Sequence, residues 1–181
     1  MFCKQLRVSL SCFLGLMGAG LALSLPSMAS SSDGYLYGKA VEAAKAGRRD
    51  AAYAYYNSIL RLPQSRYHQT ALFAKAEYFF LAGDFFSAKA AWNVFVQSYP
   101  DIPESLFALA SCYYIARLHG DPEQMAGAKQ QIVQFQQLSL VFRTSKEIRF
   151  LSPFLRRYRA VCSIDKIEFL IDDIPFETIL Y

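Results

Sequence analysis

Apolar residues between about positions 35 and 137 recur every three or four residues, the spacing that places them on one face of a helix. A clear run is Phe85, Ala88 and Trp92. Gly83 and Asp84 come directly before it, and they favour the end of one helix and the cap of the next. The pattern predicts two helices packed as a hairpin around this glycine.

This hairpin pattern repeats along the chain. Alignment of Gly47 with Gly83 superimposes segments 40–63 and 76–100 at a spacing of 36 residues, and a looser third copy has its turn at Gly120. Repeats of this length are typical of stacked helical hairpins, which form binding surfaces. We expect three hairpins in a repeat domain, 30–137, at about 35–66, 67–102 and 103–137.

The pattern changes in the C-terminal extension, 138–181. Thr144 or Ser145 is expected to begin a short helix through Phe150, and Ser152-Pro153 is a favourable start for another that carries Phe154, Leu155 and Tyr158. Beyond about Cys162, apolar and polar residues alternate on both sides of Asp172-Asp173, which predicts a β-hairpin. A lone hairpin is marginally stable in water, so we expect it to pack on the last helices or on another molecule.

The first residues have the pattern of a bacterial export signal. Lys4 and Arg7 precede an uncharged apolar stretch, Val8–Leu25, and the small residues Ser27 and Ala29 follow it. We therefore expect a signal peptide, 1–29, cleaved after Ala29, and an exported protein in the periplasm or associated with the envelope. The alternative is an uncleaved anchor, since this stretch is just long enough to span a bilayer.

Composition narrows the range of partners. Without residues 1–29 the formal charge falls from +4 to +2, which does not favour binding to nucleic acid. The chain has 15 Phe and 12 Tyr, which favours extensive packing surfaces. Cys112 and Cys162 remain in the mature chain, and they either pair in an oxidising compartment or stay as thiols. Their spacing predicts no metal site.

The second copy has small, aromatic, turn, small, aromatic and proline residues in the order Ala76, Phe79, Gly83, Ala88, Trp92 and Pro100. This pattern resembles the tetratricopeptide repeat, over about two-thirds of the mature chain. The first copy has Ala43 where the family has an aromatic residue, and the third has a longer turn. The resemblance implies an all-α fold, a right-handed α-solenoid of about three hairpins, followed here by the extension that ends in a β-hairpin.

The segment from Tyr99 to Pro103 is similar to the linker of exported bacterial members of this family. These members include the tol-pal system coordinator and the outer-membrane assembly lipoproteins, and they work as periplasmic adaptors. The chain lacks the lipid-anchor cysteine of the latter and the coiled-coil N-terminus of the former. The resemblance therefore implies an adaptor role without either identity.

In such arrays the first helices of successive repeats line a concave groove, which implies a binding site here. The matching positions are Tyr37, Phe73 and Phe107, then Glu77 and Ser111, then Phe80 and Tyr114. Several aromatic residues with little charge favour an apolar groove for a partner helix or extended peptide. The alternative is that these aromatic residues fill the space between repeats or lie under the chain's own tail.

Charge is divided within the tail. Residues 143–159 carry a net charge of +5 and residues 160–181 carry −4. We expect the two halves to neutralise each other in the folded tail. The alternative is a surface for anionic lipid headgroups, with peripheral membrane contact, formed by Arg149, Arg156, Arg157 and Arg159.

No pattern typical of an enzyme is present, so we expect no catalytic site, cofactor or metal. The expected function is a periplasmic or envelope adaptor that binds a partner protein in the groove. The alternative is a structural subunit of an envelope assembly, which uses the repeats and the terminal hairpin to oligomerise. Deletion of 164–181 is expected to spare groove binding and to abolish assembly.

Overall fold

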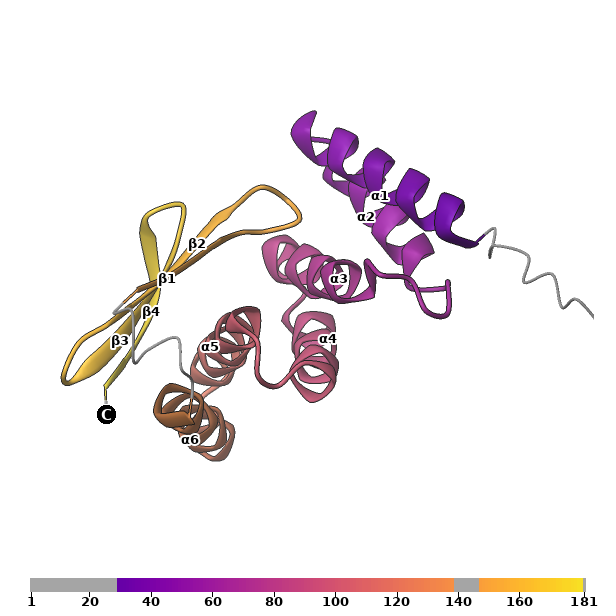
Figure 1. Ribbon diagram of the computed structural model, residues 1–181. Helices are drawn as coiled ribbons and strands as arrows, with labels where there is room; N and C mark the ends of the chain where they lie inside the picture. Colours follow the sequence, from indigo (N-terminus) through magenta and orange to yellow (C-terminus); the bar gives the residue numbers. More distant parts are fainter. Residues whose placement is uncertain (1–28, 139–146, 181) are drawn as a thin grey trace, which may run out of the picture.

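The computed structural model describes residues 29–138 and 147–180, with the side chains of residues 32–135 and 147–180 (Figure 1). The predicted signal peptide, apart from Ala29, and the expected helix start at Thr144 or Ser145 lie outside these residues. None of the described helices is long and apolar enough to cross a membrane. The elements in chain order are α1 (Ala29–Lys45), α2 (Arg49–Ile59), α3 (His68–Ala82), α4 (Phe85–Ser98), α5 (Pro103–Leu118), α6 (Pro122–Leu138), β1 (Glu147–Leu151), β2 (Arg157–Cys162), β3 (Lys166–Ile171) and β4 (Ile174–Leu180).

The six helices form three hairpins at the positions that the repeat pattern predicts. Gly47, Gly83 and Gly120 end the first helices with φ of 70°, 78° and 65°. Only glycine adopts this left-handed conformation without strain. Asp84 and Asp121 cap the following helices, because each carboxylate accepts a hydrogen bond from a backbone N–H three residues later, at 3.1 and 3.0 Å.

The hairpins stack side by side, so that α2 packs on α3 and α4 packs on α5 (Figure 1). The apolar stripe of α4 supplies much of the contact. Trp92 and Phe95 on this helix are fully buried, and Phe73 of α3 meets the Trp92 ring edge-on at a centroid distance of 4.8 Å. Burial of each large aromatic side chain contributes about 2 kcal/mol or more to folding.

The C-terminal extension forms a four-stranded antiparallel sheet in the order β1-β2-β3-β4. The two short helices expected around Phe150 and after Ser152-Pro153 are therefore wrong, since these segments belong to β1, a turn and β2. Residues face alternate sides in β2: Tyr158 and Ala160 are buried, while Arg157 and Arg159 face outward. This period of two is typical of a half-buried strand.

The predicted terminal hairpin is present as β3 and β4. Asp172 and Asp173 have φ of 51° and 65° and join the strands in two residues. Left-handed conformations at both positions match the right-handed twist of the strands, and aspartate tolerates them. The register shifts between Phe169 and Leu170, where β3 and β4 form an irregular pair.

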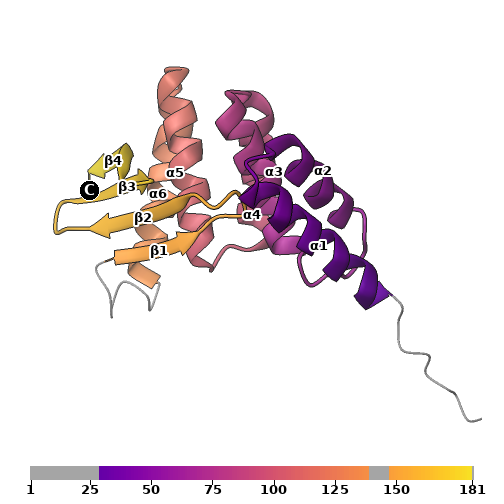
Figure 2. The same cartoon turned by 90° about the horizontal axis from the view of Figure 1, so that it is seen from above.

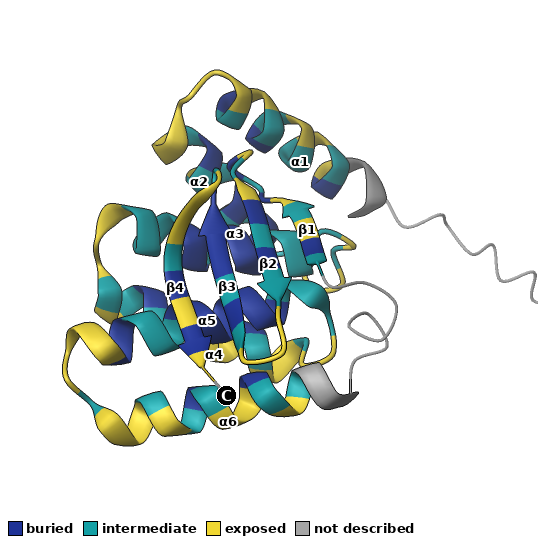
Figure 3. Cartoon of the chain, turned by 90° about the vertical axis from the view of Figure 1, so that its left-hand side faces the viewer, coloured by how far each residue is buried: buried dark blue, intermediate teal, exposed yellow. Residues whose placement is uncertain are grey.

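The sheet packs face-on against the helices, and Figures 2 and 3 show it lying across α3 and α5. Phe107 of α5 is central, with its ring 5.0 Å from Phe150, 5.5 Å from Tyr158 and 5.8 Å from Phe169. Helices and strands thus share one hydrophobic core. The fold is mixed helix and sheet, and the all-α class holds only for residues 29–138.

Candidate functional site

The predicted groove residues lie on the first helices of the hairpins, but most do not face solvent. Phe73, Glu77, Phe107 and Ser111 are buried, with exposed fractions of 2% or less. The sheet covers them: Phe73 contacts Phe150 at 5.3 Å and Tyr158 at 5.8 Å between ring centroids. In this structure the chain's own tail fills this part of the groove, and no partner reaches these four residues.

The other predicted aromatic pair also contacts the sheet. Phe80 and Tyr114 each lie 6.3 Å from the ring of Phe176 on β4, and 5.8 Å from one another. Both remain half-buried. Phe80 and Tyr114, which occupy matching positions in successive repeats, therefore do contact one another. They pack against the C-terminal sheet, however, and not against a partner in an open groove.

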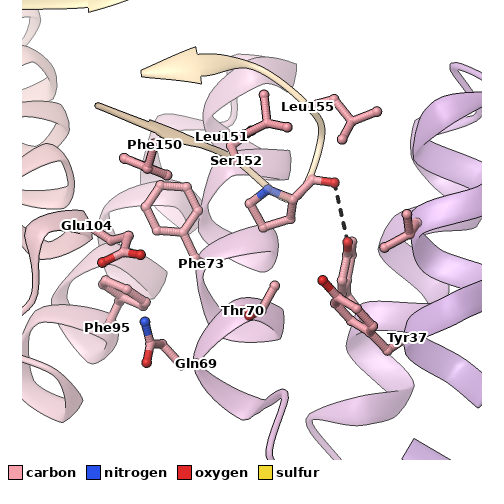
Figure 4. Close-up of a pocket in the computed structure, with 13 residues that line it drawn as sticks. Tyr37, Gln69, Thr70, Phe73, Phe95, Glu104, Phe150, Leu151, Ser152 and Leu155 are labelled. Atoms are coloured by element: carbon pink, nitrogen blue, oxygen red, sulfur yellow. Dashed lines mark hydrogen bonds between the residues drawn. The ribbon is translucent and has the colours of Figure 1, made fainter. Parts of the chain in front are cut away.

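One end of the groove stays open, between the first hairpin and the turn that joins β1 to β2 (Figure 4). A cavity of about 250 Å³ lies there, which we call the seam cavity. Two predicted groove residues, Tyr37 and Phe73, line it. Its other lining residues are Val41, Tyr56, Gln69, Thr70, Phe95, Glu104, Phe150, Leu151, Ser152, Pro153 and Leu155.

Aromatic rings form much of the wall. Phe73 packs edge-on against Phe95 and Phe150, each at a centroid distance of 5.3 Å. Tyr37 stacks on Tyr67 at 4.1 Å with nearly parallel rings, which orients it at the opposite side of the cavity. These rings are held by packing with other aromatic residues, so the wall keeps its shape without a ligand.

The β1–β2 turn forms the upper rim in Figure 4. The Tyr56 hydroxyl donates a hydrogen bond to the Pro153 carbonyl at 3.3 Å, which ties the turn to α2. The Ser152 hydroxyl accepts from the backbone N–H of Arg156 at 3.0 Å, and Leu155 has φ of 61°. Local hydrogen bonds and one contact to the first hairpin thus fix this rim.

Polar groups gather at another part of the cavity. Figure 4 shows Glu104 and Gln69 close to the ring of Phe95. Glu104 is the second residue of α5 and is half-buried, and among the described residues it takes part in none of the ion pairs. The residues that line the cavity include no lysine or arginine. The site therefore carries net negative charge beside an aromatic wall.

Glu77 lies beneath this turn, fully enclosed between α3 and the sheet. Burial raises the pKa of its carboxyl to about 7. The hydroxyls of Ser152 and Tyr158 lie near the carboxylate and partly offset this shift, although neither carboxylate oxygen has the geometry of a hydrogen bond to a described residue. The same burial raises the pKa of Tyr158 well above its usual value. Glu77 is therefore a buried group that packs beneath the β1–β2 turn and does not line the open part of the cavity.

The four arginines proposed for a lipid surface are paired with carboxylates. Arg149 and Arg159 contact Glu147 at 2.6 and 2.7 Å. The remaining contacts are Arg156 with Asp172 at 2.5 Å, Arg157 with Asp173 at 3.1 Å and Arg159 with Asp173 at 2.7 Å. The charges of the two halves of the tail offset each other within the sheet.

Cys112 and Cys162 both lie within the described residues, and they are not joined by a disulfide. Cys112 lies on α5, with its thiol 3.7 Å from the Asn93 side-chain oxygen. Burial raises the pKa of this thiol to about 12, so it is a weak nucleophile at neutral pH. Of the two alternatives open from the sequence, the structure has the thiols.

Sequence reasoning missed Gln69, Thr70 and Glu104 as site residues. Pro103 of the predicted linker begins α5, but the sequence around it does not indicate that the next residue, Glu104, lies beside the β1–β2 turn, which comes about fifty residues later in the chain. No protein-family model matches the chain, and no curated protein matches it either. The functional conclusion therefore rests on the geometry and on the residue patterns themselves.

Proposed function

We propose that the chain is an adaptor that binds a partner protein at the seam cavity. The observation that carries this proposal is the cover on the groove: the sheet shields Phe73 and Phe107 from solvent, and the seam cavity remains open near the first hairpin. Stacked helical hairpins commonly provide binding surfaces of this kind. The proposed binding site is therefore at the N-terminal end of the groove, whereas the repeat pattern predicted it along the middle.

The wider setting is part of the same proposal. The tetratricopeptide pattern centred on Gly83, with a right-handed solenoid as its geometry, supports a protein partner. The charged and apolar segments before Ala29 support export, with the mature chain in the periplasm or at the envelope. The three stacked hairpins are compatible with this repeat family.

Photo-crosslinking in cells tests the proposal. A benzophenone amino acid replaces Gln69 at the cavity, and the matched control carries it at Gln130, an exposed glutamine of α6. We expect the Gln69 position to capture a discrete envelope protein that the Gln130 position does not. Equal capture at both positions, or crosslinks from Gln69 to the chain's own turn alone, contradicts the adaptor.

A second candidate, a structural subunit that assembles by strand addition, is favoured by the exposed edge of the sheet. Among the described strands β4 has a neighbour on one side only, and Ile174 and Leu180 are 67% and 60% exposed. Its one charged residue, Glu177, is buried and paired with Arg117 at 3.0 Å. Exposed charges are a usual protection of sheet edges, and this edge has none.

Crosslinking from Thr178, an exposed residue of β4, distinguishes the two candidates. A subunit that assembles through this edge gives dimers or larger species from Thr178 and no partner from Gln69. An adaptor gives the reverse. Pro175 removes one backbone donor near the start of the strand, so the crosslinker is placed beyond it.

A further inference from the structure

The lining of the seam cavity combines aromatic faces with hydrogen-bond acceptors. Phe73 and Phe150 form part of the wall, and Glu104 brings a carboxylate to its edge. The Pro153 carbonyl, which accepts a hydrogen bond from the Tyr56 hydroxyl, is a further acceptor on the lining residues. An aromatic wall with excess negative charge is complementary to a cation.

We infer that the seam cavity binds a basic side chain, arginine or lysine, that a partner protein projects into it. This inference deepens the proposed adaptor function and rests on it for the identity of the partner as a protein. A guanidinium or ammonium group placed against the half-buried ring of Phe150 and the Glu104 carboxylate gains a cation–π contact and a charge-assisted hydrogen bond.

The size of the cavity fits this class of ligand. Its volume is about 250 Å³, whereas pockets for small molecules and cofactors usually run from about 300 Å³ upward. A single long side chain with an apolar stem and a charged end fills such a space. The stem contacts the rings, and the charged end reaches the acceptors at the polar part of the wall.

Other side chains fit the lining less well. An acidic side chain would meet the Glu104 carboxylate, with no cationic group among the lining residues to compensate. An uncharged aliphatic side chain would cover the polar groups of Gln69 and Glu104 without pairing them, which costs free energy. The neighbouring surface already has a related contact, since the Arg66 guanidinium lies 4.7 Å from the centroid of the Tyr67 ring.

The chain offers a closely matched control for Glu104. Pro103-Glu104 begins α5 and Pro122-Glu123 begins α6, so both glutamates are the second residue of a helix after a proline. Glu123 is exposed and does not line the cavity. Replacement of either by glutamine removes the same charge from the same place in a helix, so any effect on helix stability is shared.

The test is a titration of the mature chain, followed by NMR, with N-acetyl-argininamide and N-acetyl-lysinamide as the probes. N-acetyl-norleucinamide, which has a similar length without the charge, is the comparison ligand. We expect the basic probes to shift resonances of Thr70, Phe150 and Leu151, which line the cavity and are not buried. The Glu104→Gln variant should bind them about fivefold more weakly, and Glu123→Gln should bind as the unmodified chain does.

The inference would be overturned if norleucinamide bound as tightly as the basic probes, or if Glu104→Gln and Glu123→Gln bound the basic probes with equal affinity. Absence of any shift at the cavity up to the solubility of the probes would also overturn it. Amide spectra of both variants establish that they fold. A partner captured from Gln69 together with no basic preference rejects this inference alone, whereas probe binding at the cavity without a captured protein rejects the adaptor function alone.

Discussion

Glu77 illustrates how the fold changes the chemistry of a single residue. From its position in the repeat it was expected to line an open groove, yet it is fully buried between α3 and the sheet. A carboxyl group in such surroundings favours its neutral form, which is why its pKa rises to about 7. Its protonation state is therefore linked to the stability of the fold.

We predict that Glu77 makes the protein less stable as the pH rises from about 4.5 to 7. In this range the unfolded chain has lost the proton and the folded chain still holds it, so the free energy of unfolding falls, by about 3 kcal/mol in all. Glu77→Gln should remove this fall. Urea unfolding at several pH values measures it, with Glu123→Gln as the control.

Glu147 changes stability with pH in the opposite direction to Glu77, so the contributions of the two residues can be told apart. Hydrogen bonds from Arg149 and Arg159 lower its pKa to about 2, so its stabilising contribution is present above pH 4.5 and is lost as the pH falls towards 2. A Glu77→Gln variant that keeps the full decline in stability between pH 4.5 and 7 would show that another group causes it.

At the scale of elements, the helical hairpins follow from local chemistry. The apolar stripes, the turn glycines and the capping aspartates all act within a few residues of one another, so the positions of the six helices could be read from the chain. The strands β1 and β2 could not. Ser152-Pro153 resembles a helix start, and the alternation of Arg157, Tyr158, Arg159 and Ala160 becomes informative only when one face has something to pack on.

The turn glycines allow a prediction at this scale. Gly83 ends α3 with φ of 78°, so Gly83→Ala should destabilise the protein by about 1 kcal/mol. Gly127 lies within α6 and has no atom within 4 Å of an added methyl group, so Gly127→Ala should stabilise it by about 0.5–1 kcal/mol. Thermal unfolding measures both changes: Gly83→Ala should lower the melting temperature and Gly127→Ala should raise it. A change of the same sign and size in both variants would contradict the prediction.

At the scale of the whole molecule, the sheet and the helices stabilise one another. Ile167, Phe169 and Ile179 of the last two strands are buried in the same cluster as Phe107 of α5. Neither part has a complete core by itself. The expectation that residues 164–181 are a separable assembly element therefore conflicts with the packing.

We predict that deletion of 164–181 abolishes cooperative unfolding, because it removes β3 and β4 and exposes the Phe107 ring. A milder variant, Phe107→Ala, should cost about 3–5 kcal/mol, while Phe86→Ala, at a side chain that is 88% exposed, should cost little. Differential scanning calorimetry measures all three. A deletion variant that still unfolds in one sharp transition would show that the helices fold without the sheet.

The sequence by itself determined that three helical hairpins turn at Gly47, Gly83 and Gly120, that a β-hairpin turns at Asp172-Asp173, and that Tyr37, Phe73 and Phe107 lie on the first helices of the hairpins. These depend on periodicity and turn chemistry, which are local. The tertiary structure decided what covers that side, and it placed Glu77 inside the molecule and Glu104 at an open cavity. Those outcomes depend on contacts between residues far apart in the chain, because the free energy of burying aromatic surface is shared across all the elements that meet there.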